Sequence, residues 1–262
     1  MNIVLGITTY NRLEYLKQTL DGWDATRNKQ HDWAVIVADD GSTDGTLPYL
    51  ADRLKDIPHH VLSNQRRGVH HQTNTILKHC SDIEFDFGFK IDDDLIFKKK
   101  GWDELYLSGM KKFDHLVFHD PQWKRVKRQR EPVQNEQFEC RSYWNDLQGA
   151  FWTFTPRVIS TIGYFDLKNF GLCGFGHRDY TYRCCKAGFN CFDNIFDMRG
   201  SLEYLELIKH KYHSAPDRDS TWQYWNTYQL WQYKISKFND ERLYIPYKDE
   251  PVDIYGHSLI KL

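Results

Sequence analysis

The stretch that most constrains the fold of this chain runs from Phe85 to Phe97, FDFGFKIDDDLIF. Its first seven residues alternate between apolar side chains and Asp86, Gly88 and Lys90, and such a period of two is typical of a β-strand. The strand leads directly into three adjacent aspartates, which repel one another and cannot be buried without a positive partner. A hard divalent cation, Mg²⁺ or Mn²⁺, would meet that need, and a solvated acidic turn is the simpler alternative.

The N-terminal part of the chain alternates between strand and helix patterns. Buried strands are expected at Ile3–Thr8, Trp33–Ala38 and His60–Ser63, and amphipathic helices at Leu13–Trp23, Leu47–Leu54 and Val69–Cys80. Thr9 or Asn11 can cap the first helix. This order predicts right-handed βαβ units and a parallel sheet, with a ligand site outside the carboxyl ends of the strands. Asp86 and Lys90 fit this poorly, because a central parallel strand is normally apolar on both faces.

The second half of the chain is less regular. Helices are expected at Trp102–Lys112, Pro156–Ile162 and Asp179–Gly188, and strands at His115–His119 and Gly149–Thr155. Five basic residues lie between Lys124 and Arg130, in a polar stretch that we interpret as a solvated loop or as a lid or contact for an anionic acceptor. A long aromatic helix is expected at Ser220–Phe238, packed against the domain or, alternatively, bound to a membrane surface.

Composition narrows the function further. The 35 basic and 36 acidic residues leave a net charge of -1, which does not favour nucleic acid as a partner. Aromatic residues make up 16% of the chain, and their rings suit sugars or bases. The six cysteines form no CxxC pair, which favours reduced thiols and a cytoplasmic location. No run of about 18 apolar residues occurs, so we expect at most peripheral membrane contact.

Several sequence motifs follow one another in a familiar order. They are ITTYNR, VADDGSTDGT, NQRRGVHHQTN and KIDDD after the four expected strands, then LQGAFWTFTPRVISTIGYFD and GFGHRDYTYRCCKAG. Over roughly residues 3 to 190 they resemble family 2 glycosyltransferases of the GT-A fold. The resemblance implies an α/β fold with a mostly parallel central sheet flanked by helices and an irregular C-terminal acceptor-side region. It implies a catalytic domain at 1–215, with a nucleotide-binding half at 1–97 and an acceptor-binding half at 98–215, and a helical extension at 216–262 packed on it.

The same resemblance implies where a nucleotide sugar would bind. Contacts are expected from Thr8, Tyr10, Arg12, Asp40, Arg67, Gly68, Asp92 and Asp93. The turn after the first strand offers backbone NH groups and a cation to the base and phosphates. Asp40 is expected to accept a hydrogen bond from uracil, and Asp92 to meet the ribose. Arg66 is the alternative to Arg67, and capping of the following helix is the alternative role for Asp39 or Asp40.

Metal and acid–base roles follow from the resemblance as well. Asp94 is expected to bind Mn²⁺ or Mg²⁺, with His213, or else His210, completing the metal shell. Asp179 aligns with the aspartate of the family's Glu-Asp motif and is expected to be the general base. Arg178 stands where that motif has glutamate, which favours an unusual acceptor such as an anionic one. Capping of its own helix, beside this arginine, is the alternative role for Asp179.

The function implied is inverting transfer of a sugar from a UDP-sugar to a hydroxyl of a glycan or glycolipid. Trp152 and Trp144 are candidates for stacking against the acceptor sugar, and a core role is the alternative for Trp152. A sugar-1-phosphate nucleotidyltransferase has a similar sheet, but its GxGxR loop is absent from ITTYNR. A catalytically inactive carbohydrate- or nucleotide-binding module of the same fold is the other alternative, which Arg178 favours.

Overall fold

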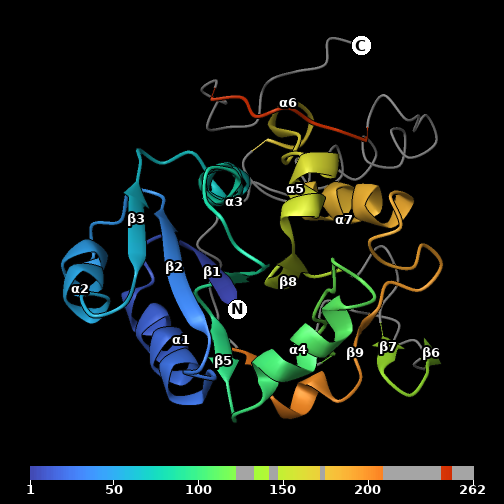
Figure 1. Cartoon of the computed structure of the whole chain (residues 1–262). Coiled ribbons are helices and arrows are strands. Elements are labelled where there is room, and N and C mark those ends of the chain that lie inside the picture. The colour runs from blue at the N-terminus through green and yellow to red at the C-terminus, as the bar shows by residue number, and fades with distance from the viewer. Residues whose placement is uncertain (122–132, 142–146, 172–174, 209–242, 250–262) are drawn as a thin grey trace.

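A central sheet with the strand order β3-β2-β1-β4-β8 organises the protein (Figure 1). The computed structural model describes residues 1–121, 133–141, 147–171, 175–208 and 243–249. Strands β1 (Asn2–Thr9), β2 (Asp32–Asp39), β3 (His59–Ser63) and β4 (Phe87–Asp92) run parallel, and β8 (Phe151–Phe154) runs antiparallel to β4. The carboxyl ends of the four parallel strands therefore lie along one edge of the sheet, as the sequence predicts.

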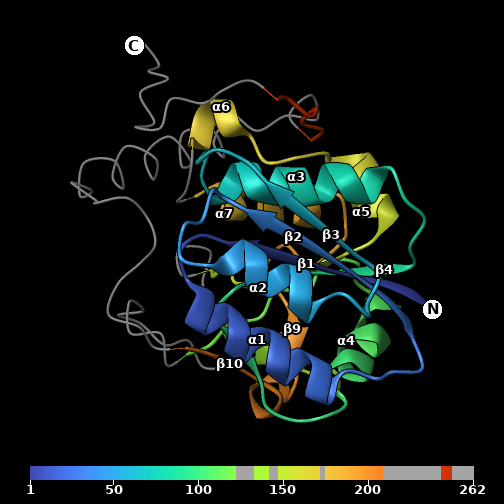
Figure 2. The same ribbon diagram turned by 90° about the vertical axis from the view of Figure 1, so that its left-hand side faces the viewer.

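Helices cover both faces of this sheet (Figure 2). On one face lie α1 (Leu13–Thr26), α2 (Thr46–Arg53) and α4 (Trp102–Met110), and on the other lie α3 (Val69–Ser81), α5 (Pro156–Ile162), α6 (Leu167–Phe170) and α7 (Gly176–Lys186). Because side chains alternate along a strand, β1 serves both layers: Leu5 and Ile7 pack with α1, and Val4 packs with α3. Among the helices that the structure describes, none combines the length and apolarity needed to cross a bilayer.

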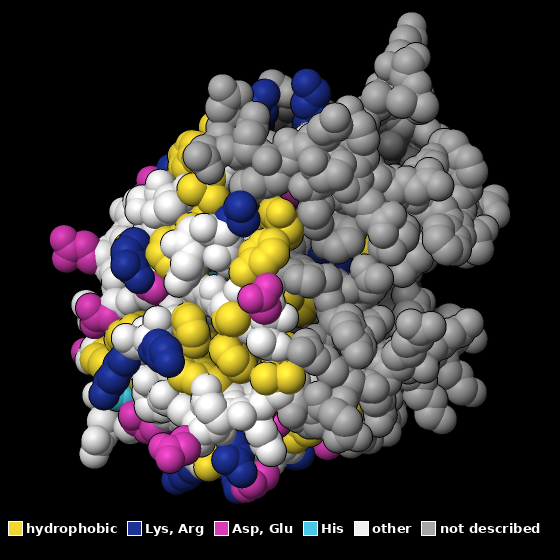
Figure 3. Space-filling model, turned by 90° about the vertical axis from the view of Figure 1, so that its right-hand side faces the viewer, with side chains coloured by type: hydrophobic (Ala, Val, Ile, Leu, Met, Phe, Trp, Pro, Cys, Tyr) yellow, Lys and Arg dark blue, Asp and Glu magenta, His cyan; other side chains and the backbone are white. Residues whose placement is uncertain are grey.

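Shorter strands lie beyond the end of β4. The strand β5 (Leu95–Phe97) pairs antiparallel with β10 (Leu205–Leu207). A separate three-stranded sheet contains β6 (Val133–Gln134), β7 (Phe138–Cys140) and β9 (Asp197–Met198), and the 3-10 turn η2 (Ser201–Glu203) follows it. Figure 3 shows the face on the side of β6 and β7, where apolar and charged side chains are interspersed. Of these short elements, β5 and β10 lie directly beside the carboxyl edge, since β5 follows β4 and the residue after β10 donates a backbone hydrogen bond to Asp94.

The prediction of a strand at His115–His119 is wrong. The structure has in its place an isolated antiparallel bridge between Val117 and Trp152. The reason lies in the neighbouring strand, where Thr153 Oγ1 accepts the hydrogen bond from the N–H of Leu116 at 2.8 Å. A side-chain oxygen therefore takes the place of a backbone carbonyl, and the ladder does not continue. The other strands and helices predicted within the described residues are present, and α5 has the predicted bounds.

The start of α1 also differs from the prediction. Neither Thr9 nor Asn11 caps it; the N–H of Leu13 donates instead to Asp44 Oδ2, at 2.9 Å, from the loop after β2. Asn11 adopts a left-handed φ of 49°, and its N–H donates to Ser42 Oγ at 2.8 Å. The loops after β1 and β2 are therefore joined to each other at the carboxyl edge.

Two buried histidines, His70 and His115, connect the layers of the structure. His115 Nδ1 donates to Thr153 O at 3.0 Å, and its Nε2 accepts from Thr181 Oγ1 of α7 at 2.9 Å. Burial lowers the pKa of His115 to about 4, so the imidazole is neutral near pH 7. His70 of α3 donates in the same way from Nδ1 to Gly171 O, at 2.9 Å, after α6. These contacts tie α3 and α7 to the segments beside them.

Candidate active site

Asp92, Asp93 and Asp94 form an acidic turn that links β4 to β5 at the carboxyl edge. Its backbone is held from two sides. The N–H of Asp92 donates to Ala150 O beside β8, and Asp94 O accepts from the N–H of Ile208 after β10, each at 2.8 Å. The exposed fraction of the side chain is 30% for Asp92, 10% for Asp94 and 3% for Asp93. Asp92 is therefore the carboxylate most open to a ligand.

Two basic side chains neutralise most of the charge of the acidic turn. Arg12, just before α1, forms ion pairs with Asp93 at 3.0 Å and with Asp94 at 2.8 Å. Lys90 is buried two residues before Asp92, on the same face of β4, and pairs with it. Burial lowers the pKa of Arg12, but Asp93 and Asp94 raise it above its ordinary value, whereas burial raises the pKa of Asp93. When all five groups are ionised, three negative and two positive charges leave a net charge of one negative unit.

Hydroxyl groups fix the orientation of the carboxylates. Thr8 in β1 lies opposite Asp92 in the β1–β4 pairing, and its Oγ1 donates to Asp92 Oδ1 at 3.0 Å. Thr9 Oγ1 donates to Asp93 Oδ2 at 2.7 Å, and Thr19 Oγ1 of α1 donates to Asp93 O at 2.9 Å. The geometry of the acidic turn is thus set by the protein before any ligand arrives.

Asp40, directly after β2, joins the loop that precedes α3. Its Oδ1 accepts from the N–H of Arg67 at 2.6 Å and from Gln72 Nε2 at 2.7 Å, and its Oδ2 accepts from the N–H of Gly68 at 2.9 Å. Gly68 has a φ of 84°, a conformation that glycine adopts without strain. Asp40 therefore holds the two residues just before α3, and it does not cap the following helix α2, whose N-cap residue makes no side-chain hydrogen bond. The structure brings together Asp40, Arg67 and Gly68, and the uracil contact of Asp40 stays a prediction.

Tyr10 and Arg66 lie side by side at the same edge. The guanidinium carbon of Arg66 is 4.3 Å from the centre of the Tyr10 ring, within the range of a cation–π contact. Tyr10 follows β1, and Arg66 belongs to the loop after β3. Together with the contacts of Asp40, this pair gathers the loops after β1, β2 and β3 at one edge of the sheet.

The first turn of α7 is linked to the acidic turn through the short segment before β8. His177 Nε2 donates to Leu147 O at 2.8 Å, and a Cβ atom on Gly149 would lie 3.0 Å from the His177 ring. Lys90 Nζ, the partner of Asp92, is 3.5 Å from Gly149 O. The short segment before β8 therefore separates the acidic turn from the helix that carries the predicted base.

Asp179 is buried within this helix, which begins three residues before it rather than at it. Its carboxylate is 1% exposed, and Oδ2 accepts from Arg183 Nε at 3.0 Å. Arg183 also donates to Ile162 O at 2.6 Å and to Tyr164 O at 2.7 Å, so it joins α7 to the end of α5. The arginine that pairs with Asp179 is thus one helical turn away, and not its neighbour Arg178.

The two predicted acceptor contacts have different surroundings. Arg178 lies with its guanidinium carbon 4.2 Å from the centre of the Phe175 ring. Trp152 is 2% exposed, and its ring centre is 5.2 Å from that of Tyr180 and 6.2 Å from that of Phe165. The ring of Trp152 packs into the layer of α5 and α7, so its core role replaces the predicted acceptor contact.

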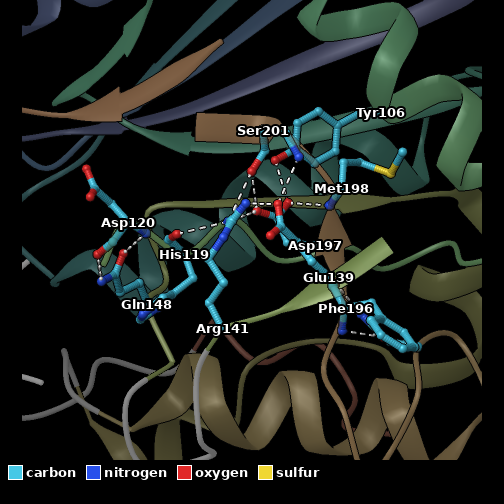
Figure 4. A network of polar contacts seen from close by, with 12 residues as sticks. Tyr106, His119, Asp120, Glu139, Arg141, Gln148, Phe196, Asp197, Met198 and Ser201 are labelled. Carbon is cyan, nitrogen blue, oxygen red and sulfur yellow. Dashed lines mark hydrogen bonds and ion pairs between the residues drawn. The ribbon is translucent and has the colours of Figure 1, made fainter. Parts of the chain in front are cut away.

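A buried network of ion pairs and hydrogen bonds lies beside the site (Figure 4). Arg141, after β7, pairs with Glu139 and, at 3.2 Å, with Asp197 Oδ2. Asp197 also accepts from Tyr106 Oη of α4 at 2.6 Å and from Ser201 Oγ at 2.6 Å. Burial raises the pKa of Asp197, and Arg141 opposes that rise. We call these five residues the Arg141 network; it joins β7, β9, η2 and α4.

Asp120 lies next to this network (Figure 4), and β10 links it to the acidic turn. Arg141 Nη1 is 3.5 Å from His119 O, just before Asp120. The Oδ2 atom of Asp120 accepts from the N–H of Leu207 at 3.1 Å, and the residue after Leu207 donates to the acidic turn. Asp120 and Gln148 exchange two hydrogen bonds, each of 3.0 Å. The acidic turn is therefore supported from the second half of the chain as well as from β1.

The acidic turn offers carboxylate oxygens, the donors that Mg²⁺ and Mn²⁺ prefer. Within the described ranges, no group of three or more His, Cys, Asp or Glu side chains is arranged to hold a metal ion by itself. The donor chemistry thus fits a divalent ion that takes further ligands, such as phosphate oxygens. His213, His210, Trp144 and the predicted loop and helix at 124–130 and 220–238 lie outside the described residues.

Comparison with known sequences identifies the family. The family described as "Glycosyl transferase family 2" matches residues 5–168, more than half of the chain. The chain belongs to this family. The enzyme is thus a glycosyltransferase, and an uncharacterized glycosyltransferase of Acanthamoeba polyphaga mimivirus is 30% identical to it over 213 residues, which cover 78% of this chain and 80% of the relative.

Solved structures confirm the fold of the glycosyltransferase. S. aureus TarS 1–349 in complex with UDP-GlcNAc has a TM-score of 0.64 and 16% identity, over 93% of this chain and 69% of that chain. The mannosyltransferase PcManGT from Pyrobaculum calidifontis, in complex with GDP-Man and Mn²⁺, has a TM-score of 0.57 and 14% identity, over 92% and 67%. In another TarS 1–349 structure the chain spans about half of its counterpart, 55%. At these identities the likeness establishes the predicted α/β fold of GT-A type.

Proposed function

We propose that this glycosyltransferase moves a sugar from a UDP-sugar to a hydroxyl of a glycan or glycolipid, with inversion at the anomeric carbon. The proposal is carried by one observation: the carboxyl edge of the sheet gathers Arg12, Asp40 and the acidic turn from three parallel strands. Ligands of open α/β sheets bind at this edge, and cations beside carboxylates suit a diphosphate with its metal ion. The complex of TarS with UDP-GlcNAc supports a nucleotide sugar as the donor class.

Donor binding in this proposal uses residues from every loop at that edge. They are Thr8, Tyr10, Arg12, Asp40, Arg67, Gly68, Asp92 and Asp93, with uracil on Asp40 and the ribose on Asp92. Mn²⁺ or Mg²⁺, held by Asp94 and His213, would stabilise the negative charge of the departing diphosphate when bound. Arg12, already beside the acidic turn, would add a fixed positive charge on the same side.

The reaction exchanges one bond and moves one proton. The acceptor hydroxyl oxygen bonds to the anomeric carbon from the face opposite UDP, the carbon–oxygen bond to UDP breaks, and UDP leaves with the electron pair. Asp179 would take the hydroxyl proton as general base, which requires a carboxylate oxygen within about 3 Å of the hydroxyl in the productive complex. Arg178, the preceding residue, would contact the acceptor and favours an anionic one.

A donor screen tests the proposed function. The purified glycosyltransferase is incubated with Mn²⁺ and each of a panel of UDP-sugars, and binding and release of UDP are measured. We expect UDP to bind and at least one UDP-sugar to be consumed, faster with an acceptor present. Pyrophosphate formed from UTP and a sugar 1-phosphate would identify a nucleotidyltransferase instead. UDP binding without turnover would identify an inactive binding module, and no UDP binding at all would reject the donor class.

Replacing Asp179 by Asn is expected to lower kcat by at least about a hundredfold, because an amide cannot take the hydroxyl proton. The dissociation constant for UDP should stay near the wild-type value, since the predicted nucleotide contacts lie on other elements. Rates of UDP release give kcat, and titration calorimetry gives the dissociation constant.

A matched variant separates this role from the ion pair that Asp179 makes. Arg183→Lys keeps the positive charge one turn along α7 but loses the planar group that donates to Ile162 and Tyr164. If Asp179 serves only to hold Arg183, both variants lower the melting temperature and both retain the kcat of the folded enzyme. That result would remove Asp179 from proton transfer.

A further inference from the structure

Residues 243–249 form a strap on the same side of the sheet as α3 and α5 (Figures 1 and 2). Ile245 fixes it, since its N–H donates to Ile162 O at 3.1 Å and its carbonyl accepts from the N–H of Tyr164 at 2.9 Å. Gly163, between these two residues, has a φ of 70°, and a Cβ atom there would lie 2.0 Å from Ile245 O. The strap therefore passes against the end of α5 at a place that only glycine permits.

The far end of the strap reaches the loop before α3. Asp249 Oδ1 accepts from Arg67 Nη1 at 2.7 Å and lies 3.4 Å from Nε2 of His71, on the first turn of α3. The backbone N–H of Arg67 donates at the same time to Asp40 Oδ1. Arg67 thus contacts Asp40, the residue predicted to bind uracil, through its backbone, and it contacts the strap through its guanidinium group.

The solvent exposure of the Arg67–Asp249 ion pair indicates whether it contributes to stability or to the position of Arg67. The side chain of Asp249 is 67% exposed, that of Arg67 21% and that of His71 2%. An ion pair so open to water adds little to the stability of the fold. It does restrict a long and flexible arginine to one position, which lowers the entropy that a ligand must overcome to contact the guanidinium. Buried His71 is a second, fixed neighbour of the same carboxylate.

We propose that Asp249 is a positioning residue for donor binding: it holds the Arg67 guanidinium toward the edge of the nucleotide site, where that group meets the anionic part of UDP. This inference rests on the proposed function and deepens it. It assigns a part in donor recognition to a residue 182 positions along the chain from Arg67, on the strap rather than on the sheet. The ligand class is a uridine diphosphate, bound with its divalent ion.

The experiment measures UDP binding and turnover of the full chain in the presence of Mn²⁺. Asp249→Ala should raise the dissociation constant for UDP and the KM for the UDP-sugar about threefold, and leave kcat at saturating donor little changed. Asp249→Glu, which restores the carboxylate, should recover most of the affinity. The matched control is Asp52→Ala on α2, which removes an 82% exposed carboxylate that pairs with Lys55. It should leave the dissociation constant for UDP and the KM for the UDP-sugar unchanged.

A double-mutant cycle tests whether the effect passes through Arg67. Arg67→Gln alone should weaken UDP binding, and adding Asp249→Ala to it should cause no further loss. Unchanged affinity in Asp249→Ala, or full additivity in the double variant, would overturn the proposal. Tighter binding in Asp249→Ala would overturn it too, because the carboxylate would then compete with the diphosphate for Arg67. Failure of the wild-type protein to bind UDP would instead reject the proposed function.

Discussion

Asp94→Asn is expected to lower the rate of sugar transfer about a thousandfold at saturating Mn²⁺, because metal stabilisation of the leaving diphosphate is worth several kcal/mol and each 1.4 kcal/mol is tenfold in rate. The amide has the same size as the carboxylate but is a weaker ligand for a hard cation. Initial rates of UDP release, measured against Mn²⁺ concentration, give the size of the loss and any change in the metal requirement.

Two further observations make this result interpretable. The fold should survive the change, because Arg12 keeps its ion pair with Asp93 at 3.0 Å. Asp86→Asn makes the same chemical change at the surface, just before β4. Among the described residues, the Asp86 carboxylate accepts one hydrogen bond, from the backbone N–H of Asn2 at 2.8 Å. The Asp86→Asn enzyme should transfer sugar at the wild-type rate. A folded Asp94→Asn enzyme with more than a tenth of the wild-type rate would show that Asp94 does not hold the ion.

Arg141→Met is expected to lower the free energy of unfolding by about 3–5 kcal/mol, the cost of removing one member of a buried ion-pair network. The side chain of Arg141 is 9% exposed and faces the carboxylates of Glu139 and Asp197, which would then repel each other with no cation between them. Methionine replaces the aliphatic stem of arginine with an unbranched apolar side chain, so the lost packing of the stem contributes less than the loss of charge. Urea denaturation followed by circular dichroism measures the difference.

The ion pair of Arg157 provides the control for this change, because its cation is at the surface. Arg157 is 68% exposed, and the carboxylate of its partner Asp114 keeps a hydrogen bond from Thr155 Oγ1 at 2.7 Å, so Arg157→Met should cost only about 1 kcal/mol. Adding Asp197→Asn to the Arg141→Met variant should recover part of the lost stability, since one uncompensated charge is removed. Equal destabilisation by the two arginine variants would show that Arg141 contributes no more to stability than the exposed cation of Arg157.

The first half of the fold was predictable because its signals are local. The period of two in β4 and the helical spacing of Leu16, Leu20 and Trp23 depend on burial of one face or both, and the structure buries these residues. Lys90 fits poorly in a buried strand, and the spacing of apolar residues alone does not predict its role. It lies on the same face as Asp92 and is its counter-ion. An ill-fitting charge next to a cluster of opposite charge is a signal that could have found this residue.

The parts that the sequence did not give depend on contacts between distant segments. The Asp40 carboxylate takes its hydrogen bonds from residues 27 to 32 positions further on, so no local pattern shows that it holds the loop before α3 instead of capping α2. The pairing of Asp179 with Arg183 can be predicted from their i,i+4 spacing in a helix. The carbonyl groups of Ile162 and Tyr164, which accept from Arg183, cannot be predicted from any local pattern. Trp152 shows the same limit, because an aromatic residue in a strand can face a ligand or the core.

The two protein cations beside the acidic turn have a consequence for how the enzyme fills its site. Because Arg12 and Lys90 already balance most of the local charge, we expect the protein to fold without manganese and a free ion to bind weakly on its own. The diphosphate adds the missing negative charge and the missing ligands together. We therefore expect the metal ion and the donor to bind together, and UDP and the ion to be released together after transfer.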